Sequence, residues 1–136
     1  MNSSKKIFAI ILLITATVFN ACEKTEPDVP TTDRDKFIGT YEAESNGPVS
    51  GTRNFNMTIT ISSSAPDEIK MVNFDDSNGT TVFAKVLGNS LSISPQHISG
   101  ETYQGTGNIS GSTITITFTI DDGQTVENRV LTGDKI

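Results

Sequence analysis

Apolar and polar residues alternate along two clear stretches of residues 36–136. The apolar positions are Phe55, Met57, Ile59 and Ile61 in the first stretch, and Ile114, Ile116, Phe118 and Ile120 in the second. Asn or Thr fills the positions between them. Successive side chains of a strand point to opposite faces, so each stretch predicts a strand that buries one face and exposes the other. A helical period fits neither stretch, and the branched Thr side chain suits a strand.

Weaker alternation predicts further strands near 37–45, 68–74, 81–87, 90–94, 102–109 and 125–132. Short sequences with turn chemistry separate them, namely Gly88-Asn89, Ser110-Gly111 and Asp122-Gly123. About eight short strands at this spacing, with no helical pattern between them, predict an all-β domain of antiparallel hairpins. The pattern leaves open whether the sheet closes into a barrel or folds into a sandwich.

The N-terminus has a different pattern. Lys5 and Lys6 precede an apolar run over residues 7–19, which is followed by Asn20, Ala21 and Cys22. This order of positive, apolar and small residues is typical of a secretory signal peptide. The alternative is a membrane-spanning helix, but the run has about 13 residues and a span needs roughly 20.

Cys22 is the single cysteine of the chain and stands directly after the small residue. The sequence Phe19-Asn20-Ala21-Cys22 resembles the lipobox of bacterial lipoproteins, although Asn20 is unusual at its position. The resemblance implies cleavage between Ala21 and Cys22, removal of residues 1–21, and attachment of lipid such as palmitate to Cys22. The alternative is an ordinary signal with an incidental cysteine. An acylated cysteine anchors the protein without a spanning helix, because each buried methylene contributes about 0.8 kcal/mol.

Residues 22–35 are rich in charge and proline, which predicts a disordered tether between the lipid and a domain over 36–136. Glu23, Glu26 and Asp28 resemble an acidic export signal of surface lipoproteins, or they simply keep a linker soluble. Loss of Lys5 and Lys6 changes the formal charge from −6 to −8. Such an acidic domain repels nucleic acid. With no second cysteine, no intramolecular disulfide can form.

The sequence Lys36-Phe37-Ile38-Gly39-Thr40-Tyr41, the Thr/Ile strands and the hairpin at 110–114 resemble small lipocalin-like lipoproteins of the Bacteroidota. The resemblance covers roughly residues 36–133 and the lipobox. It implies an eight-stranded meander that closes into a short barrel or a strongly curled sheet. It also implies a place in the cell envelope, on the outer membrane or at the cell surface. The family has no common activity, so no catalytic residue is implied.

Groups that could perform catalysis or bind metal are few. His97 is the single histidine, and a zinc site needs three or four ligands. Asp75-Asp76 and Asp121-Asp122 could serve as paired carboxylates, but Gly or Asn beside each pair favours a turn. No motif marks a nucleophile for His97 to activate. We therefore expect no enzyme activity, no metal site and no cofactor.

Tyr103, Gly105 and Gly107 share one face of the strand expected at 102–109, opposite polar residues. Inward glycines either allow the strand to bend or leave space for a ligand. The second possibility suggests a binding module for a small apolar ligand or a partner segment, with these three residues as its candidate site. The competing hypothesis is a structural or surface-interaction lipoprotein with a filled core, since an eight-stranded barrel can be filled by its own side chains.

Overall fold

A computed structural model describes residues 32–136 of the protein. They form eight β-strands and two short 3-10 helices, η1 and η2. In chain order these are η1 (Asp33–Lys36), β1 (Gly39–Gly47), β2 (Gly51–Ile61), β3 (Glu68–Val72), η2 (Phe74–Asp76), β4 (Thr81–Leu87), β5 (Ser90–Ile98), β6 (Glu101–Ser110), β7 (Thr113–Asp121) and β8 (Val126–Lys135).

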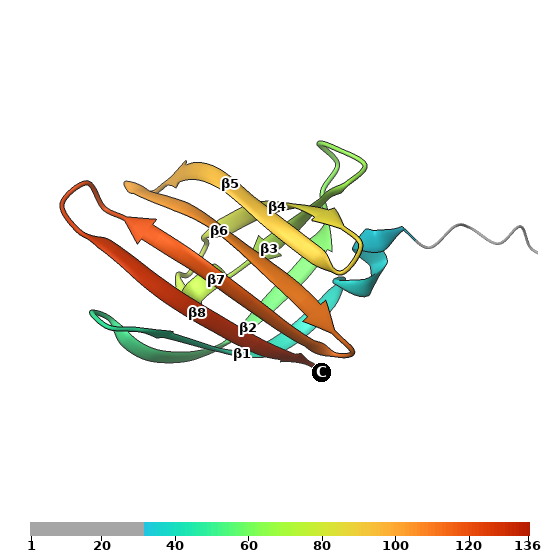
Figure 1. Ribbon diagram of the computed structural model, residues 1–136, viewed down its shortest axis with the longest axis horizontal. Helices are drawn as coiled ribbons and strands as arrows, with labels where there is room; N and C mark the ends of the chain where they lie inside the picture. Colours follow the sequence, from blue (N-terminus) through green and yellow to red (C-terminus); the bar gives the residue numbers. More distant parts are fainter. Residues whose placement is uncertain (1–31) are drawn as a thin grey trace, which may run out of the picture.

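The strands form one antiparallel meander that closes into a barrel (Figure 1). Each strand pairs with the next along the chain, and β8 returns to pair with β1 from Tyr41↔Lys135 to Asn46↔Val130. The predicted all-β fold with about eight antiparallel strands is therefore confirmed. Closure between β1 and β8 decides in favour of the barrel over the sandwich.

The interior of the barrel is filled with apolar side chains. Most of the alternating apolar residues that predicted β2 and β7 point inward, and Met57, Ile59, Ile114 and Ile116 are fully buried. Ile61, the last residue of β2, was predicted on the same face but is 51% exposed. Phe74 of η2 packs among them, with its ring 4.7 Å from that of Phe118 in an edge-on arrangement. Full burial of such side chains contributes about 1.5–3 kcal/mol each, so this core is the main stabilising feature of the fold.

The two ends of the barrel are closed by different elements. At the end where the described chain begins, here called the η1 end, Arg34 donates hydrogen bonds to the carbonyl oxygens of Ser62, Ala65 and Glu68 at 3.2–3.4 Å. At the opposite, distal end lie the connections 48–50, 73–80, 99–100 and 122–125. The composition of 22–35 predicts a tether up to residue 35, but residues 33–35 belong to η1. Arg34 attaches this helix to the chain between β2 and β3, and Asp33 accepts from the Gly88 N–H.

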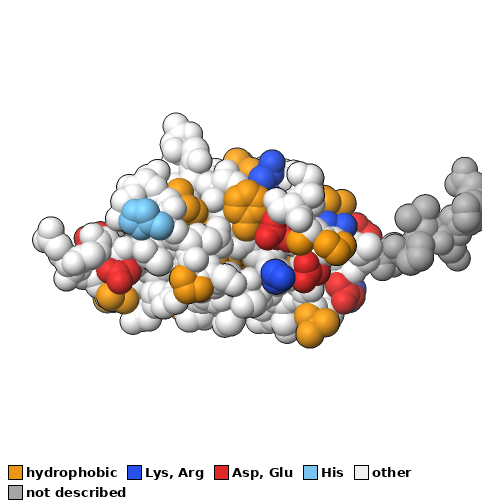
Figure 2. Space-filling view, turned by 90° about the horizontal axis from the view of Figure 1, so that it is seen from above, with side chains coloured by type: hydrophobic (Ala, Val, Ile, Leu, Met, Phe, Trp, Pro, Cys, Tyr) orange, Lys and Arg blue, Asp and Glu red, His pale blue; other side chains and the backbone are white. Residues whose placement is uncertain are grey.

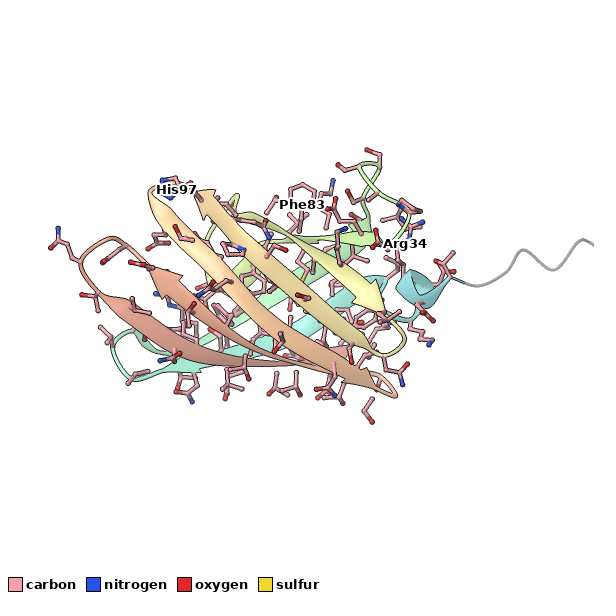
Figure 3. All side chains as sticks on the ribbon, turned by 45° about the horizontal axis from the view of Figure 1, so that its top comes forward. Arg34, Phe83 and His97 are labelled. Atoms are coloured by element: carbon pink, nitrogen blue, oxygen red, sulfur yellow. The ribbon has the colours of Figure 1, made fainter. Side chains whose placement is uncertain are left out.

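A side chain bridges β4 and β5 where the two strands do not pair directly. Only the ends of the two strands pair, from Lys85↔Ser92 to Leu87↔Ser90. Farther along, the amide of Gln96 accepts from the Phe83 N–H at 2.9 Å and donates to the Phe83 carbonyl at 2.6 Å. The ring of Phe83 stands on the outer wall between the two ends of the barrel (Figure 3).

The predicted leader over 1–21, the lipid at Cys22 and most of the predicted tether lie outside the described residues, so they stay predictions. Within residues 32–136, neither 3-10 helix has the length and apolar character needed to cross a membrane.

Candidate functional site

A buried cluster of charged side chains lies inside the distal end of the barrel. Arg129 of β8 is at its centre, with a side chain that is 0% exposed. Its Nε donates to Asp75 at 3.0 Å, its Nη1 donates to Glu127 at 3.2 Å, and its Nη2 donates to the Ser45 hydroxyl at 2.8 Å. Buried charges are tolerated when they are paired and hydrogen-bonded in this way.

Asp75 reaches this cluster because the backbone around η2 has an unusual conformation. Asn73, Asp75 and Asp76 all have φ between 57° and 59°, a left-handed region that Asn and Asp adopt more readily than most residues. Arg53 of β2 holds the segment from the other side, donating from Nη1 to the Asp75 carbonyl at 3.0 Å and to Oδ2 at 2.9 Å. Burial is the largest influence on Asp75 and raises its pKa, while Ser45 and the two guanidinium groups oppose the rise.

Glu127 joins the cluster to the loop between β1 and β2. Its Oε1 accepts from the N–H groups of Val49 and Ser50 at 3.0 and 2.8 Å, and its Oε2 accepts from the Ser50 hydroxyl at 2.6 Å. Burial alone would raise the pKa of this carboxyl. These hydrogen bonds and the charge of Arg129 outweigh burial and hold the pKa at about 2.

A cleft of about 330 Å³ opens over this cluster at the distal end, which is the left end of the barrel in Figure 1. We call it the distal cleft. It combines apolar, aromatic, hydroxyl and charged side chains from three connections and the adjoining strand ends. Its lining is Val49, Ser50, Arg53, Ser77, Glu101, Tyr103, Ile120, Asp122, Thr125 and Glu127.

Tyr103 is the candidate residue that lies at this cleft. Its ring is buried, with 2% exposure, and packs edge-on against Phe74 at 6.2 Å. Its hydroxyl donates to Oε2 of Glu101 at 2.6 Å. Burial, followed by the hydrogen bond and charge of Glu101, raises the pKa of Tyr103, so the phenol stays protonated at neutral pH.

Gly105 and Gly107 do not lie at the distal cleft. They pair with Phe118 and Ile116 of β7, and the inner side of each glycine is occupied by that strand. A Cβ at Gly105 would be 2.7 Å from the Phe118 Cβ and would also collide with the Thr117 carbonyl. A Cβ at Gly107 would be 2.6 Å from the Thr115 carbonyl. The glycines therefore permit close approach of β6 to β7, and the interior beside them holds no space for a ligand.

The clefts that do touch these glycines lie on the outer wall. One of about 810 Å³ runs over β4 to β7 and includes Gly107, and one of about 330 Å³ includes Gly105. Exposed residues such as Ser92, Thr106 and Thr117 form their surface. Figure 2 shows one face of the molecule, where the visible Lys and Arg side chains gather in the half nearer the η1 end.

The remaining titratable candidates are dispersed. His97 lies at the end of β5, exposed, with Nδ1 3.3 Å from the Thr102 hydroxyl (Figure 3). Asp121 and Asp122 accept hydrogen bonds from backbone N–H groups of residues 123–125, which confirms the predicted turn. Within residues 32–136, no three His, Cys, Asp or Glu side chains gather as a metal site would require.

Sequence reasoning missed Arg53, Glu101, Glu127 and Arg129. A partial signal exists in β8, where Glu127 and Arg129 occupy the same face as the buried Leu131. Because Arg129 and Asp75 are 54 residues apart, their pairing becomes visible only when the barrel closes.

Comparison with known proteins supports the architecture alone. No family model and no curated protein matches the chain. Four chains of solved structures match. One is described as EF1p2_mFAP2b bound to DFHBI; it has a TM-score of 0.52 and 16% identity, over 73% of this chain and 93% of that chain. At this identity the similarity shows a shared barrel fold, which agrees with the eight-stranded architecture implied by the lipocalin-like resemblance.

Proposed function

We propose that this protein is a lipid-anchored, non-catalytic binding module of the bacterial cell envelope that takes a small molecule in its distal cleft. The main support is the cleft itself, where the buried ring of Tyr103 lies beside polar side chains that hydrogen bonds hold in place. Binding sites for small molecules commonly combine a concave surface with a few oriented polar groups, at volumes from about 300 Å³ upward. The bound DFHBI of the structurally similar barrel is consistent with such a role.

The packing of the barrel favours the distal cleft over the interior. Phe74, Phe118 and Tyr103 fill the space in which an apolar ligand would otherwise lie. An interior ligand would require their displacement, whereas the cleft is open at its rim. The expected small apolar ligand is therefore revised to a small ligand with polar groups that contacts Tyr103.

The direction of the cleft also suits an anchored protein. The described chain begins at η1, so a lipid on Cys22 would attach the barrel through its η1 end. The distal cleft lies at the opposite end and would face away from the membrane. In this proposal the anchor is the acylated Cys22, and the membrane is the outer membrane or its exposed surface.

A second candidate function is surface interaction through the outer wall. The filled core and the groove of about 810 Å³ over β4 to β7 favour it. A protein partner would contact exposed Ser and Thr side chains there, and the barrel would act as a scaffold.

Two matched substitutions distinguish these functions. Thr125→Trp places a large side chain at the rim of the distal cleft, and Thr106→Trp places one in the outer groove; both positions are exposed in the native protein. The protein and both variants are purified from native envelopes, and co-purifying small molecules are measured by native mass spectrometry. We expect a ligand that is lost in Thr125→Trp and retained in Thr106→Trp. The opposite result, or no ligand at all, would remove the support for the cleft.

The anchor is tested separately by metabolic labelling with palmitate. Label should enter the protein and be lost in a Cys22→Ala variant, which should also leave the detergent phase. Unchanged labelling in that variant would contradict acylation at Cys22.

A further inference from the structure

The guanidinium of Arg53 lies at the distal cleft in a fixed orientation, and only part of its N–H donors are used within the described part of the protein. Its side chain is 35% exposed, and both of its hydrogen bonds within residues 32–136 leave from Nη1 toward Asp75. A guanidinium has five N–H donors, so the group retains donors on Nε and Nη2. The pair with Asp75 fixes the orientation of the guanidinium plane, which reduces the entropy cost of binding an anion.

Glu101 presents a carboxylate to the same cleft. Its Oε2 accepts from the Tyr103 hydroxyl, while no hydrogen bond from residues 32–136 reaches Oε1. Glu101 and Arg53 do not form an ion pair with one another, but both lie near the Tyr103 phenol. The charge of Glu101 raises the pKa of Tyr103 and the charge of Arg53 lowers it.

The other two carboxylates of the cleft are already engaged by the protein. Glu127 accepts from the loop between β1 and β2 and from Arg129. Asp122 accepts through Oδ1 from the N–H groups of Gln124 and Thr125, which lower its pKa, and it lies exposed in the turn between β7 and β8. Arg53 and Glu101 are therefore the charged groups that combine an unused hydrogen-bonding position with a place beside the Tyr103 phenol.

We propose that the distal cleft selects a small zwitterion, such as a free amino acid or a short peptide. Arg53 binds its carboxylate and Glu101 binds its ammonium group, with the Tyr103 hydroxyl between them. This inference rests on the proposed binding function and names the chemical class of its ligand. Charge-assisted hydrogen bonds, including the forked contact between Arg and carboxylate, provide the selectivity. A cleft of about 330 Å³ is at the small end of ligand sites, which suits a molecule of this size.

The test compares four forms of one ligand. The twenty free amino acids are first screened against the purified protein by thermal shift. The best one is then measured by titration calorimetry beside its N-acetyl form, its amide, and its N-acetyl amide. These derivatives lack the ammonium charge, the carboxylate, or both. We expect the zwitterion to bind at least about tenfold tighter than each singly blocked form, a difference of about 1.4 kcal/mol.

Variants assign the two charges. Glu101→Gln should abolish the preference for the free ammonium group and keep the preference for the carboxylate. Arg53→Lys keeps a positive charge beside Asp75 but lacks the fork, and should reduce the carboxylate preference. Glu44→Gln removes an exposed carboxylate of β1 outside the cleft and should change neither preference.

The outcomes separate this inference from the proposed function. Equal binding of the doubly blocked form, lost in Thr125→Trp, would refute zwitterion selection while leaving the cleft as a binding site. The same conclusion follows if no amino acid binds although native mass spectrometry finds a ligand lost in Thr125→Trp. Zwitterion binding that persists in Thr125→Trp would place the site elsewhere and overturn the inference. Absence of both the native ligand and amino-acid binding would refute both proposals.

Discussion

Replacement of Arg129 by Met is expected to destabilise the barrel severely. Arg129 donates five hydrogen bonds from a side chain that is 0% exposed. Met has a similar length and no charge, so the substitution leaves the Glu127 and Asp75 carboxylates buried without this partner. Breaking a buried ion pair costs about 3–5 kcal/mol. Because Arg53 still contacts Asp75, we expect a loss near the lower limit, about 3 kcal/mol.

The loss is measured as the free energy of unfolding in urea at pH 7, followed by far-UV circular dichroism. A total stability of about 5–15 kcal/mol is typical of a domain, so this change is readily resolved. The slope of the unfolding free energy against urea concentration should be the same in both proteins, since the surface exposed on unfolding is nearly unchanged. Lys85→Met is the matched control. The Lys85 side chain is 63% exposed and its Nζ lies 3.7 Å from Asp67, and such surface pairs contribute about 0–1 kcal/mol.

The pH dependence gives the reasoning a second test. Burial raises the pKa of Asp75, so the native state binds this proton at a higher pH than the unfolded state does. Removal of Arg129 should raise that pKa further. Protonation then relieves the buried charge, and the difference between the native protein and Arg129→Met should shrink as the pH falls toward 4. A loss below about 1 kcal/mol at pH 7, or a difference that grows in acid, would refute the assigned role of the cluster.

Three further predictions concern Glu127 and the loop it contacts, the contact of Gln96 between β4 and β5, and the close approach of β6 to β7. Glu127→Gln should make the free energy of unfolding less sensitive to acid between pH 4.5 and about 2. The lowered pKa of Glu127 stabilises the native state above pH 4.5, and this contribution is lost as the pH falls to about 2. An unchanged dependence of the unfolding free energy on pH, measured in urea, would contradict it. Gln96→Ala should cost about 0.5–1.5 kcal/mol, because the Phe83 N–H and carbonyl exchange their amide partner for water, and it should accelerate hydrogen exchange at the Phe83 N–H. Unchanged exchange would show that this amide does not bridge β4 and β5. Gly105→Ala should cost about 1–3 kcal/mol through overpacking against β7, and more than Gly133→Ala, where a Cβ would contact only side-chain atoms at 3.3 Å; equal melting temperatures of these two variants would contradict the packing argument.

The strands are local features, and the sequence alone predicted them well. Alternation in β2 and β7 placed Ile59 and Ile116 inside, and Gly at positions 88, 111 and 123 marked turns where the backbone adopts positive φ. These features depend on neighbours within a few residues, so a single sequence contains the information. In β8 the same alternation is misleading, because it would place the apolar side chains inside and the charged ones outside. Its Val126 and Val130 are 59% and 46% exposed, while Glu127 and Arg129 point inward.

Only the tertiary structure decided where the candidate site lies. Glycine at 105 and 107 is compatible with either a cavity or a close strand contact, and the position of β7 determined the outcome. The distal cleft depends on barrel closure, which brings Arg53 of β2 near Tyr103 of β6 and sets Asp75 between two guanidinium groups. Burial and ion pairing between distant residues depend on the packing of the whole chain, whereas strand alternation and turn conformation depend on adjacent residues. For this reason the sequence determined the type of sheet, and the closed barrel determined which charges meet at its distal end.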